Sequence, residues 1–217
     1  MYPVYKYIGK KNKVEEIPLT FPAQHQNQHP GLESVMVPRP ISENPYYQGR
    51  GKLENRVAIL TGGDSGIGRA VAYAFAKEGA DLVISYLNEH SDAEETKKRV
   101  EQLGRKCLLV PGDLQDEQMS TEVVQQALSH FGKIDILINN HAVQYVQQSI
   151  LHITAEQLDR TFRTNIYAYF FMTKAVLPHM KSGGSIINTT SVTAFEGKKE
   201  LIDYSATKGA VLTFTRS

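Results

Sequence analysis

The fold is decided by one short stretch, Thr61-Gly62-Gly63-Asp64-Ser65-Gly66-Ile67-Gly68. It follows an apolar run at residues 56–61, which has the length and composition of a buried strand. After it, residues 67–78 repeat apolar side chains at the spacing of a helix. A glycine-rich turn between a strand and a helix is the context that a dinucleotide-binding loop requires, because the first N–H groups of the helix are free to bind a pyrophosphate.

The glycines of this loop have separate expected roles. Gly62 allows the tight turn, Gly66 lets the backbone approach a phosphate, and Gly68 permits close packing of the helix on the strand. A glycine-rich turn without a ligand is the alternative interpretation, but the position after the first strand of an alternating series favours binding. We predict these cofactor-binding residues in the loop: Gly62, Asp64, Ser65, Gly66, Ile67 and Gly68.

On both sides of the loop, short apolar runs alternate with helical patterns. The expected strands cover residues 56–61, 82–86, 106–110, 134–138 and 185–188. The expected helices cover residues 67–78, 91–103 and 117–131 and run from about residue 203 to the end, and residues 154–181 contain a further long helix. Strands that are apolar throughout and that alternate with helices are typical of βαβ units, whose parallel sheet is covered on both faces. We therefore predict an α/β fold, a Rossmann-type doubly wound parallel sheet in three αβα layers.

A change of composition near residue 50 divides the chain. Seven of the nine prolines precede Gly51, and proline opposes helices and central strands. Residues 1–50 are therefore expected to form a proline-rich arm, either extended across the domain surface or partly disordered. Residues 51–217 are expected to form the nucleotide-binding catalytic domain.

Composition excludes several classes of protein. Lys and Arg number 24 against 23 Asp and Glu, a near-neutral balance that opposes nucleic-acid binding through phosphates. The single cysteine, Cys107, excludes an internal disulfide and fits a reducing compartment. The sequence has no apolar run long enough for a membrane span, no signal peptide and no metal-ligand cluster among its histidines. We expect a cytoplasmic protein without a metal.

Further motifs follow in order, and together they resemble the short-chain dehydrogenase/reductase family over residues 52–217. Tyr204-Ser205-Ala206-Thr207-Lys208 matches the family's Tyr-x-x-x-Lys, and Asn139-Asn140-His141-Ala142 stands where the family has Asn-Asn-Ala-Gly. Asn165 and Ser191 stand at the family's catalytic asparagine and serine. The N-terminal arm resembles a bacterial subgroup with N-terminal extensions, often labelled general-stress or glucose/ribitol dehydrogenase-like.

The residues of this set fit a proton transfer coupled to hydride transfer. Tyr204 and Lys208 are four apart and share a helix face, and an ammonium nearby favours the phenolate of a tyrosine. Tyr204 can then exchange a proton with a substrate hydroxyl or carbonyl, which Ser191 would hold. The resemblance implies that Lys208 also contacts the ribose and that Asn165 holds a water. Each residue alone also has an ordinary structural interpretation.

The remaining cofactor contacts come from the ends of the other strands. The resemblance implies that Asp113, followed by Leu114, contacts the adenine, although a simple Asx-turn is the alternative. Asn139 is expected to order the fourth strand and to line the groove. His141 is bulkier than the family's alanine, so we expect a shifted backbone or an outward side chain there.

The choice between NAD and NADP depends on residues 85–89, where Tyr86 is a predicted cofactor contact. Neither an acidic residue for the ribose 2′-hydroxyl nor an arginine for a 2′-phosphate stands at the expected place. The loop carries Asp64 and Ser65 in place of a cation, so we predict NAD over NADP.

The family pattern continues beyond the helix that contains Tyr204, with further strands and a substrate-covering segment. The sequence ends at Ser217, so we expect a sheet without those last strands and an exposed edge at the fifth strand. Two hypotheses follow: an NAD(P)-dependent oxidoreductase that interconverts a secondary alcohol and a carbonyl compound, or a truncated, inactive nucleotide-binding fragment or pseudoenzyme. The expected partners are a small-molecule substrate and a second copy, through the helices that contain Asn165 and Tyr204.

Overall fold

The computed structural model describes residue 20 and residues 22–217. The expectation for the arm at residues 1–50 therefore lies partly outside the described residues. None of the described helices combines the length and the apolar character that crossing a membrane requires.

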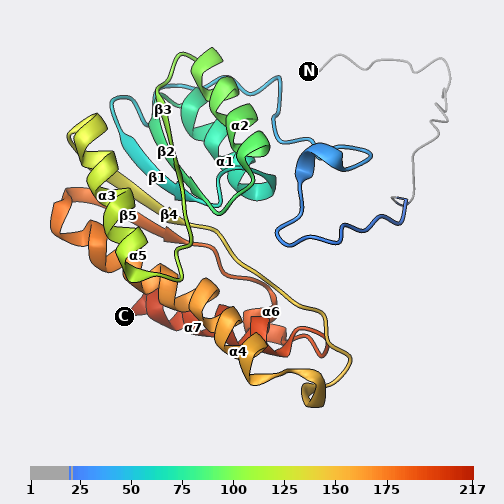
Figure 1. Cartoon of the computed structure of the whole chain (residues 1–217). Helices are drawn as coiled ribbons and strands as arrows, with labels where there is room; N and C mark the ends of the chain where they lie inside the picture. Colours follow the sequence, from blue (N-terminus) through green and yellow to red (C-terminus); the bar gives the residue numbers. More distant parts are fainter. Residues whose placement is uncertain (1–19, 21) are drawn as a thin grey trace, which may run out of the picture.

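A parallel sheet of five strands forms the centre of the molecule (Figure 1). The strands are β1 (Val57–Thr61), β2 (Asp81–Tyr86), β3 (Cys107–Pro111), β4 (Ile134–Asn139) and β5 (Met180–Asn188). Their order across the sheet is β3-β2-β1-β4-β5, so the chain reverses its winding between β1 and β4. This order confirms the predicted Rossmann-type doubly wound sheet, and ligands of such sheets bind where the winding reverses.

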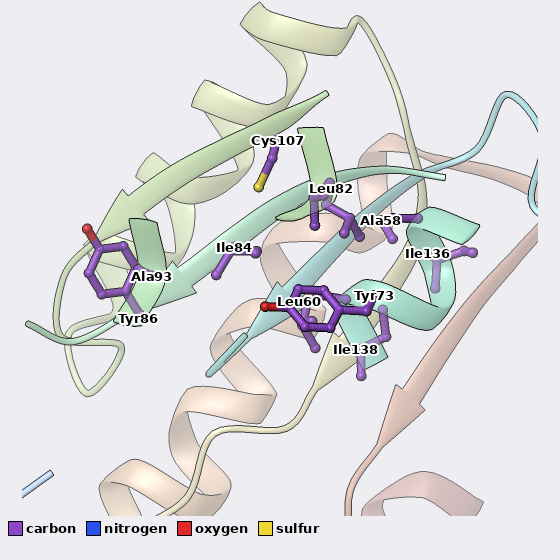
Figure 2. Packing of buried hydrophobic residues seen from close by; sticks show 13 residues of the cluster. Ala58, Leu60, Tyr73, Leu82, Ile84, Tyr86, Ala93, Cys107, Ile136 and Ile138 are labelled. Carbon is purple, nitrogen blue, oxygen red and sulfur yellow. The ribbon is translucent and has the colours of Figure 1, made fainter. Parts of the chain in front are cut away.

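Helices cover both faces of the sheet. Helices α1 (Gly66–Lys77) and α2 (His90–Gln102) bury their apolar side chains against one face, in a cluster shown in Figure 2. Helices α3 (Glu117–Phe131) and α5 (Ala168–Val176) pack in the same way on the other face. In Figure 2, Leu60 and Ile84 of the strands lie in one cluster with Tyr73 of α1. The three predicted layers are therefore present.

The long helix expected within residues 154–181 is present as one continuous helical stretch, but it is not a regular α-helix throughout. The chain forms α4 (Ala155–Phe162), a π-helical segment (Arg163–Tyr167) and α5, and β5 then begins at Met180. The side-chain amide of Asn165, in the π-helical segment, bonds both backbone groups of Val143. Pro178 has no N–H to continue the helix. The side chain of Asn165 thus points from the π-helical turn toward the loop after β4. Such turns are frequent at functional sites.

The last helices lie beside α4. Helix α6 (Thr193–Glu196) is a single turn, and α7 (Ile202–Arg216) carries Tyr204 and Lys208. β5 ends at Asn188, so Ser191 does not end the fifth strand but lies on the loop before α6. Within the described sheet β5 is an edge strand, and most of its residues are exposed.

The described part of the N-terminal arm lies against α1 and α2. The Glu43 carboxylate accepts hydrogen bonds from the Arg99 guanidinium of α2, and Lys77 of α1 lies 2.8 Å from the same carboxylate. Nearer the glycine-rich loop, the Glu33 carboxylate pairs with Arg69 of α1. The arm is therefore fixed by buried and half-buried ion pairs along its course.

Candidate active site

The glycine-rich loop connects β1 to α1 by a very close contact. Gly62 and Gly66 have positive φ angles of 63° and 52°, which glycine adopts without strain. A Cβ atom on Gly68 would lie 1.8 Å from the carbonyl oxygen of Gly62, so a larger residue cannot occupy this position without displacing the loop. The first turn of α1 is therefore seated directly on the end of β1, with its N–H groups toward the carboxyl edge of the sheet.

A cavity of about 480 Å³ opens at this edge. It brings together residues from the ends of all five strands, from α7 and from the N-terminal arm. The sequence-predicted residues that line it are Gly62, Asp64, Ser65, Ile67, Gly68, Tyr86, Asp113, Leu114, Ser191, Tyr204 and Lys208. The glycine-rich loop therefore faces the same cavity as Tyr204 and Lys208, although Gly68 and Tyr204 are 136 positions apart in the sequence.

Lys208 is almost completely buried beside this cavity, with 1% of its surface exposed. Its Nζ atom donates to the carbonyl oxygen of Thr189 at 2.8 Å and to the hydroxyl of Tyr169 at 3.4 Å. The same atom lies 5.7 Å from the centre of the Tyr204 ring, one turn earlier on α7. Burial lowers the pKa of Lys208 to about 8, because the charged form loses its hydration.

Ser191 is held by the start of α6. Its Oγ atom accepts hydrogen bonds from the N–H of Thr193 at 3.2 Å and from the Thr193 hydroxyl at 3.0 Å. With its acceptor positions used in this way, the Ser191 hydroxyl retains its proton for donation toward the cavity. Tyr204 and Ser191 thus offer two hydroxyl groups to the same space.

Asn165 lies outside the cavity and is completely buried. Its amide donates to the carbonyl of Val143 at 2.8 Å and accepts from the Val143 N–H at 2.8 Å, and it also donates to the Thr207 hydroxyl at 3.1 Å. These contacts join the loop after β4 to α7. Asn165 therefore fixes the position of the helix that carries Tyr204 and Lys208.

Two residues predicted to touch the cofactor do not reach the cavity surface. Asn139 is completely buried and donates to Asn188 of β5 at 2.9 Å, so it orders the strands but does not line the groove as expected. Its neighbour Asn140, directly after β4, lines the cavity instead and donates to the carbonyl of Gly62 at 3.1 Å. The second residue is Gly66, which does not line the cavity and whose N–H donates to Glu33 of the arm at 2.6 Å.

His141 does not take the expected outward orientation of its side chain. Its ring is turned inward, where Nδ1 shares a 2.7 Å hydrogen bond with the Thr61 hydroxyl and the ring packs edge-on against Tyr169. A Cβ atom on Gly62 would lie 3.0 Å from the Cα of His141, so the glycine provides the necessary space. Burial, and the charge of Lys208, lower the pKa of His141 to about 4. The imidazole is therefore neutral at pH 7.

Several cavity residues were missed by the sequence reasoning. They are His29, Pro30, Asn140, Arg160, Thr164, Thr189 and Thr190. Asn140 and Thr189 each follow a strand directly or end it, a position at which a parallel sheet presents ligand-binding groups. His29 and Pro30 carry no such signal, because the contact of the arm with the cavity is set by tertiary structure.

The chemistry of this cavity fits a dinucleotide. The N–H groups of Ile67 and Gly68 lie in the first turn of α1, where the helix dipole favours an anion. Nε2 of His141 is a buried polar atom without a partner among the described residues. At the opposite side, two of the three N–H groups of Lys208 are bonded to protein, which leaves one for a ligand hydroxyl.

Comparison with known proteins finds a matching family and several similar proteins. Residues 56–217 match the family described as short chain dehydrogenase. The uncharacterized oxidoreductase YhdF of Bacillus subtilis is 62% identical over 194 residues, which are 89% of this chain and 67% of that protein. The glucose and ribitol dehydrogenase of Daucus carota is 45% identical over 202 residues, which are 90% of this chain and 70% of that protein.

Solved structures share the same architecture. A short chain dehydrogenase from Burkholderia cenocepacia, crystallised in complex with NADP, gives a TM-score of 0.73 at 30% identity. That match covers 76% of this chain and 67% of the Burkholderia chain. The chain thus spans about two thirds of the length of the relatives with which it was compared.

Substitution of Gly68 by alanine is expected to open the glycine-rich loop. The new methyl group would overlap the carbonyl of Gly62, so we expect Gly68→Ala to lower the free energy of unfolding by about 1–3 kcal/mol and to weaken NADH binding about tenfold or more. The control is Gly209→Ala in α7, where nothing lies within 4 Å of the new Cβ. The free energy of unfolding of this control should rise by about 0.5–1 kcal/mol, and its affinity for NADH should stay unchanged. Equal NADH affinity in the two variants would contradict the assignment of the glycine-rich loop to the dinucleotide site.

The buried ammonium of Lys208 predicts a pH dependence of stability. Between pH 8, near its folded pKa, and its ordinary value of 10.5, the unfolded chain binds more protons than the folded chain, so stability rises with pH. Relative to Lys208→Met, the free energy of unfolding of the wild-type protein should increase by about 3 kcal/mol across this window. Urea unfolding of both proteins measures the difference, and a difference that stays constant or falls with pH would refute the burial of a charged group.

Proposed function

Because the chain belongs to the short-chain dehydrogenase family, we propose that it interconverts a secondary alcohol and a carbonyl compound with a nicotinamide dinucleotide. One observation carries the proposal: Tyr204, Lys208 and Ser191 line the same cavity as the glycine-rich loop. A site that only bound a nucleotide would have no need for a buried ammonium beside a tyrosine, given the cost of its desolvation. This pairing favours an enzyme over the inactive nucleotide-binding alternative.

Tyr204 is the proposed acid and base. In the oxidation direction its phenolate accepts the proton of the substrate hydroxyl, and in the reduction direction its phenol donates the proton to the carbonyl oxygen. The dinucleotide, when bound, supplies the hydride acceptor or donor. The Lys208 ammonium, held by Thr189 and Tyr169, favours the negative charge that forms on Tyr204.

Ser191 is the proposed orienting group for the substrate oxygen. Its hydroxyl proton is free to donate, because Thr193 occupies its acceptor side. A hydrogen bond from Ser191 to the reacting oxygen would hold that oxygen beside Tyr204 in both directions of the reaction. Asn165 acts as a positioning residue through its bond to Thr207, which fixes α7.

The proposed cofactor is a nicotinamide dinucleotide. The predicted preference for NAD gains no support from the Burkholderia relative, which was crystallised with NADP. The proposal that NAD is the better ligand therefore depends on the charges of this chain alone: Asp64 and Glu89 line the cavity near the end of β2 and are both buried. The lining cations Arg160 and Lys208 belong to α4 and α7, which follow β4 in the chain.

The proposed substrates are small alcohols and carbonyl compounds, with sugars and polyols as the first to test. The Daucus carota relative is named as a dehydrogenase of glucose and ribitol. A panel of sugars, polyols and aldehydes, followed through the absorbance of the reduced nicotinamide, is the direct assay.

Removal of one hydroxyl group tests the role of Tyr204. Tyr204→Phe is expected to reduce kcat by about 10²–10⁴-fold while the dissociation constant for NADH changes by less than about threefold, because only the proton transfer is lost. Tyr167→Phe is the matched control: Tyr167 is 45% exposed, does not line the cavity and should tolerate the change. Turnover by Tyr204→Phe at the wild-type rate would exclude Tyr204 as the acid and base.

A further inference from the structure

The Glu33 carboxylate of the N-terminal arm is bound directly to the glycine-rich loop. Its Oε2 atom accepts the N–H of Gly66 at 2.6 Å, and its Oε1 atom accepts from Nη1 of Arg69 at 2.6 Å. Glu33 and Arg69 are both buried, with 5% and 2% of their surfaces exposed. A charge-assisted hydrogen bond to the first turn of α1 is a strong contact at the end of a helix dipole.

The surroundings hold Glu33 in this position from two sides. The backbone N–H groups of Glu33 and Ser34 donate to the carboxylate of Asp92, at the start of α2, at 2.7 and 3.1 Å. Arg69 in turn donates to the backbone oxygen of Asp64, within the loop, at 3.0 and 2.9 Å. Glu33 therefore lies between the first turns of α1 and α2, and Arg69 connects it to the loop.

The arm also reaches the cavity itself. His29 and Pro30, a few residues before Glu33, line the cavity, and the His29 ring contacts the Tyr145 ring after β4, with centroids 5.1 Å apart. The arm thus spans from the loop after β4 to the start of α1. His29 and Pro30 are in this way a built part of the cavity, whereas Glu33 does not line the cavity itself and contacts the loop through Gly66.

The charge of Glu33 matters because of where it lies. The segment between β2 and α2 follows the strand end at which such folds distinguish a ribose 2′-hydroxyl from a 2′-phosphate. Four buried carboxylates, Glu33, Asp64, Glu89 and Asp92, lie around this segment and the loop. Two cations face them: the buried Arg69, and Arg39, which is 42% exposed and lies 3.6 Å from the Glu33 carboxylate, so the carboxylates outnumber the cations. An additional phosphate dianion would meet a negative potential there.

We propose that Glu33 is a positioning and specificity residue, which seats the glycine-rich loop through Gly66 and Arg69 and disfavours a dinucleotide with a 2′-phosphate. The specificity part rests on the proposed function, whereas the seating of the loop does not. Glu33 touches neither the substrate nor the reacting atoms, so it acts through the loop and through its charge.

Hydrogen–deuterium exchange of the ligand-free protein tests the seating of the loop. In Glu33→Gln the side chain keeps its size but loses its charge, so the amides of residues 64–69 should exchange about tenfold faster than in the wild-type protein. Glu43→Gln is the matched control, because it also removes an arm carboxylate that binds a helix cation, Arg99, but lies away from the loop. Unchanged exchange in Glu33→Gln would overturn the seating role.

Fluorescence titration with NADH and NADPH tests the specificity role. The ratio of the NADPH to the NADH dissociation constant should fall about threefold or more in Glu33→Gln, because a negative charge is removed near the additional phosphate. Glu43→Gln, and Glu33→Asp, which keeps the charge, should leave the ratio within about twofold. An equal change of both constants in Glu33→Gln would reduce Glu33 to a structural role and overturn its part in specificity.

These measurements also separate the inference from the function on which it depends. If the wild-type protein bound neither NADH nor NADPH, the proposed function would fail and the specificity role with it. The exchange rates would still decide the seating of the loop, since faster exchange in Glu33→Gln supports it and unchanged exchange overturns it.

Discussion

The contact between Gly68 and the carbonyl of Gly62 is the constraint on which the rest of the site depends. It brings α1 onto the end of β1 at a distance that no side chain would permit. The first turn of α1, with the N–H groups of Ile67 and Gly68, then lies at the place where the winding of the sheet reverses, between β1 and β4. Because all five strands are parallel, their carboxyl ends reach the same edge and contribute to one cavity.

The second half of the site depends on how α7 is held. Lys208 is buried without a carboxylate partner among the described residues, and its hydrogen bonds to Thr189 and Tyr169 offset only part of the lost hydration. Asn165 fixes the helix from the other side through Thr207. Such a buried charge costs stability, which is a common property of functional sites in folded proteins.

Much of this could be predicted from the sequence, because short-range patterns carry it. The alternation of apolar strands and helices follows from burial on both faces, and the positions of Tyr204 and Lys208 follow from helical spacing. The glycine-rich loop lies where it was expected, since its position after β1 is fixed by local sequence.

The features that escaped prediction depend on contacts between distant segments. The amide of Asn165, in the π-helical turn, is hydrogen-bonded to both backbone groups of Val143, and no local spacing signals those bonds. Asn139 is kept out of the cavity by its bond to Asn188 of β5, a contact between strands that no local pattern signals. The inward orientation of the His141 ring and the position of Glu33 between α1 and α2 likewise follow from tertiary packing.

The crystal structure of this chain with NADH bound is the measurement that tests the account most directly. The account predicts that the pyrophosphate lies at the first turn of α1 and that the nicotinamide ring lies beside Tyr204, with a ribose hydroxyl within hydrogen-bond distance of Lys208. A dinucleotide bound elsewhere on the chain, or one whose nicotinamide ring lies away from Tyr204, would contradict it.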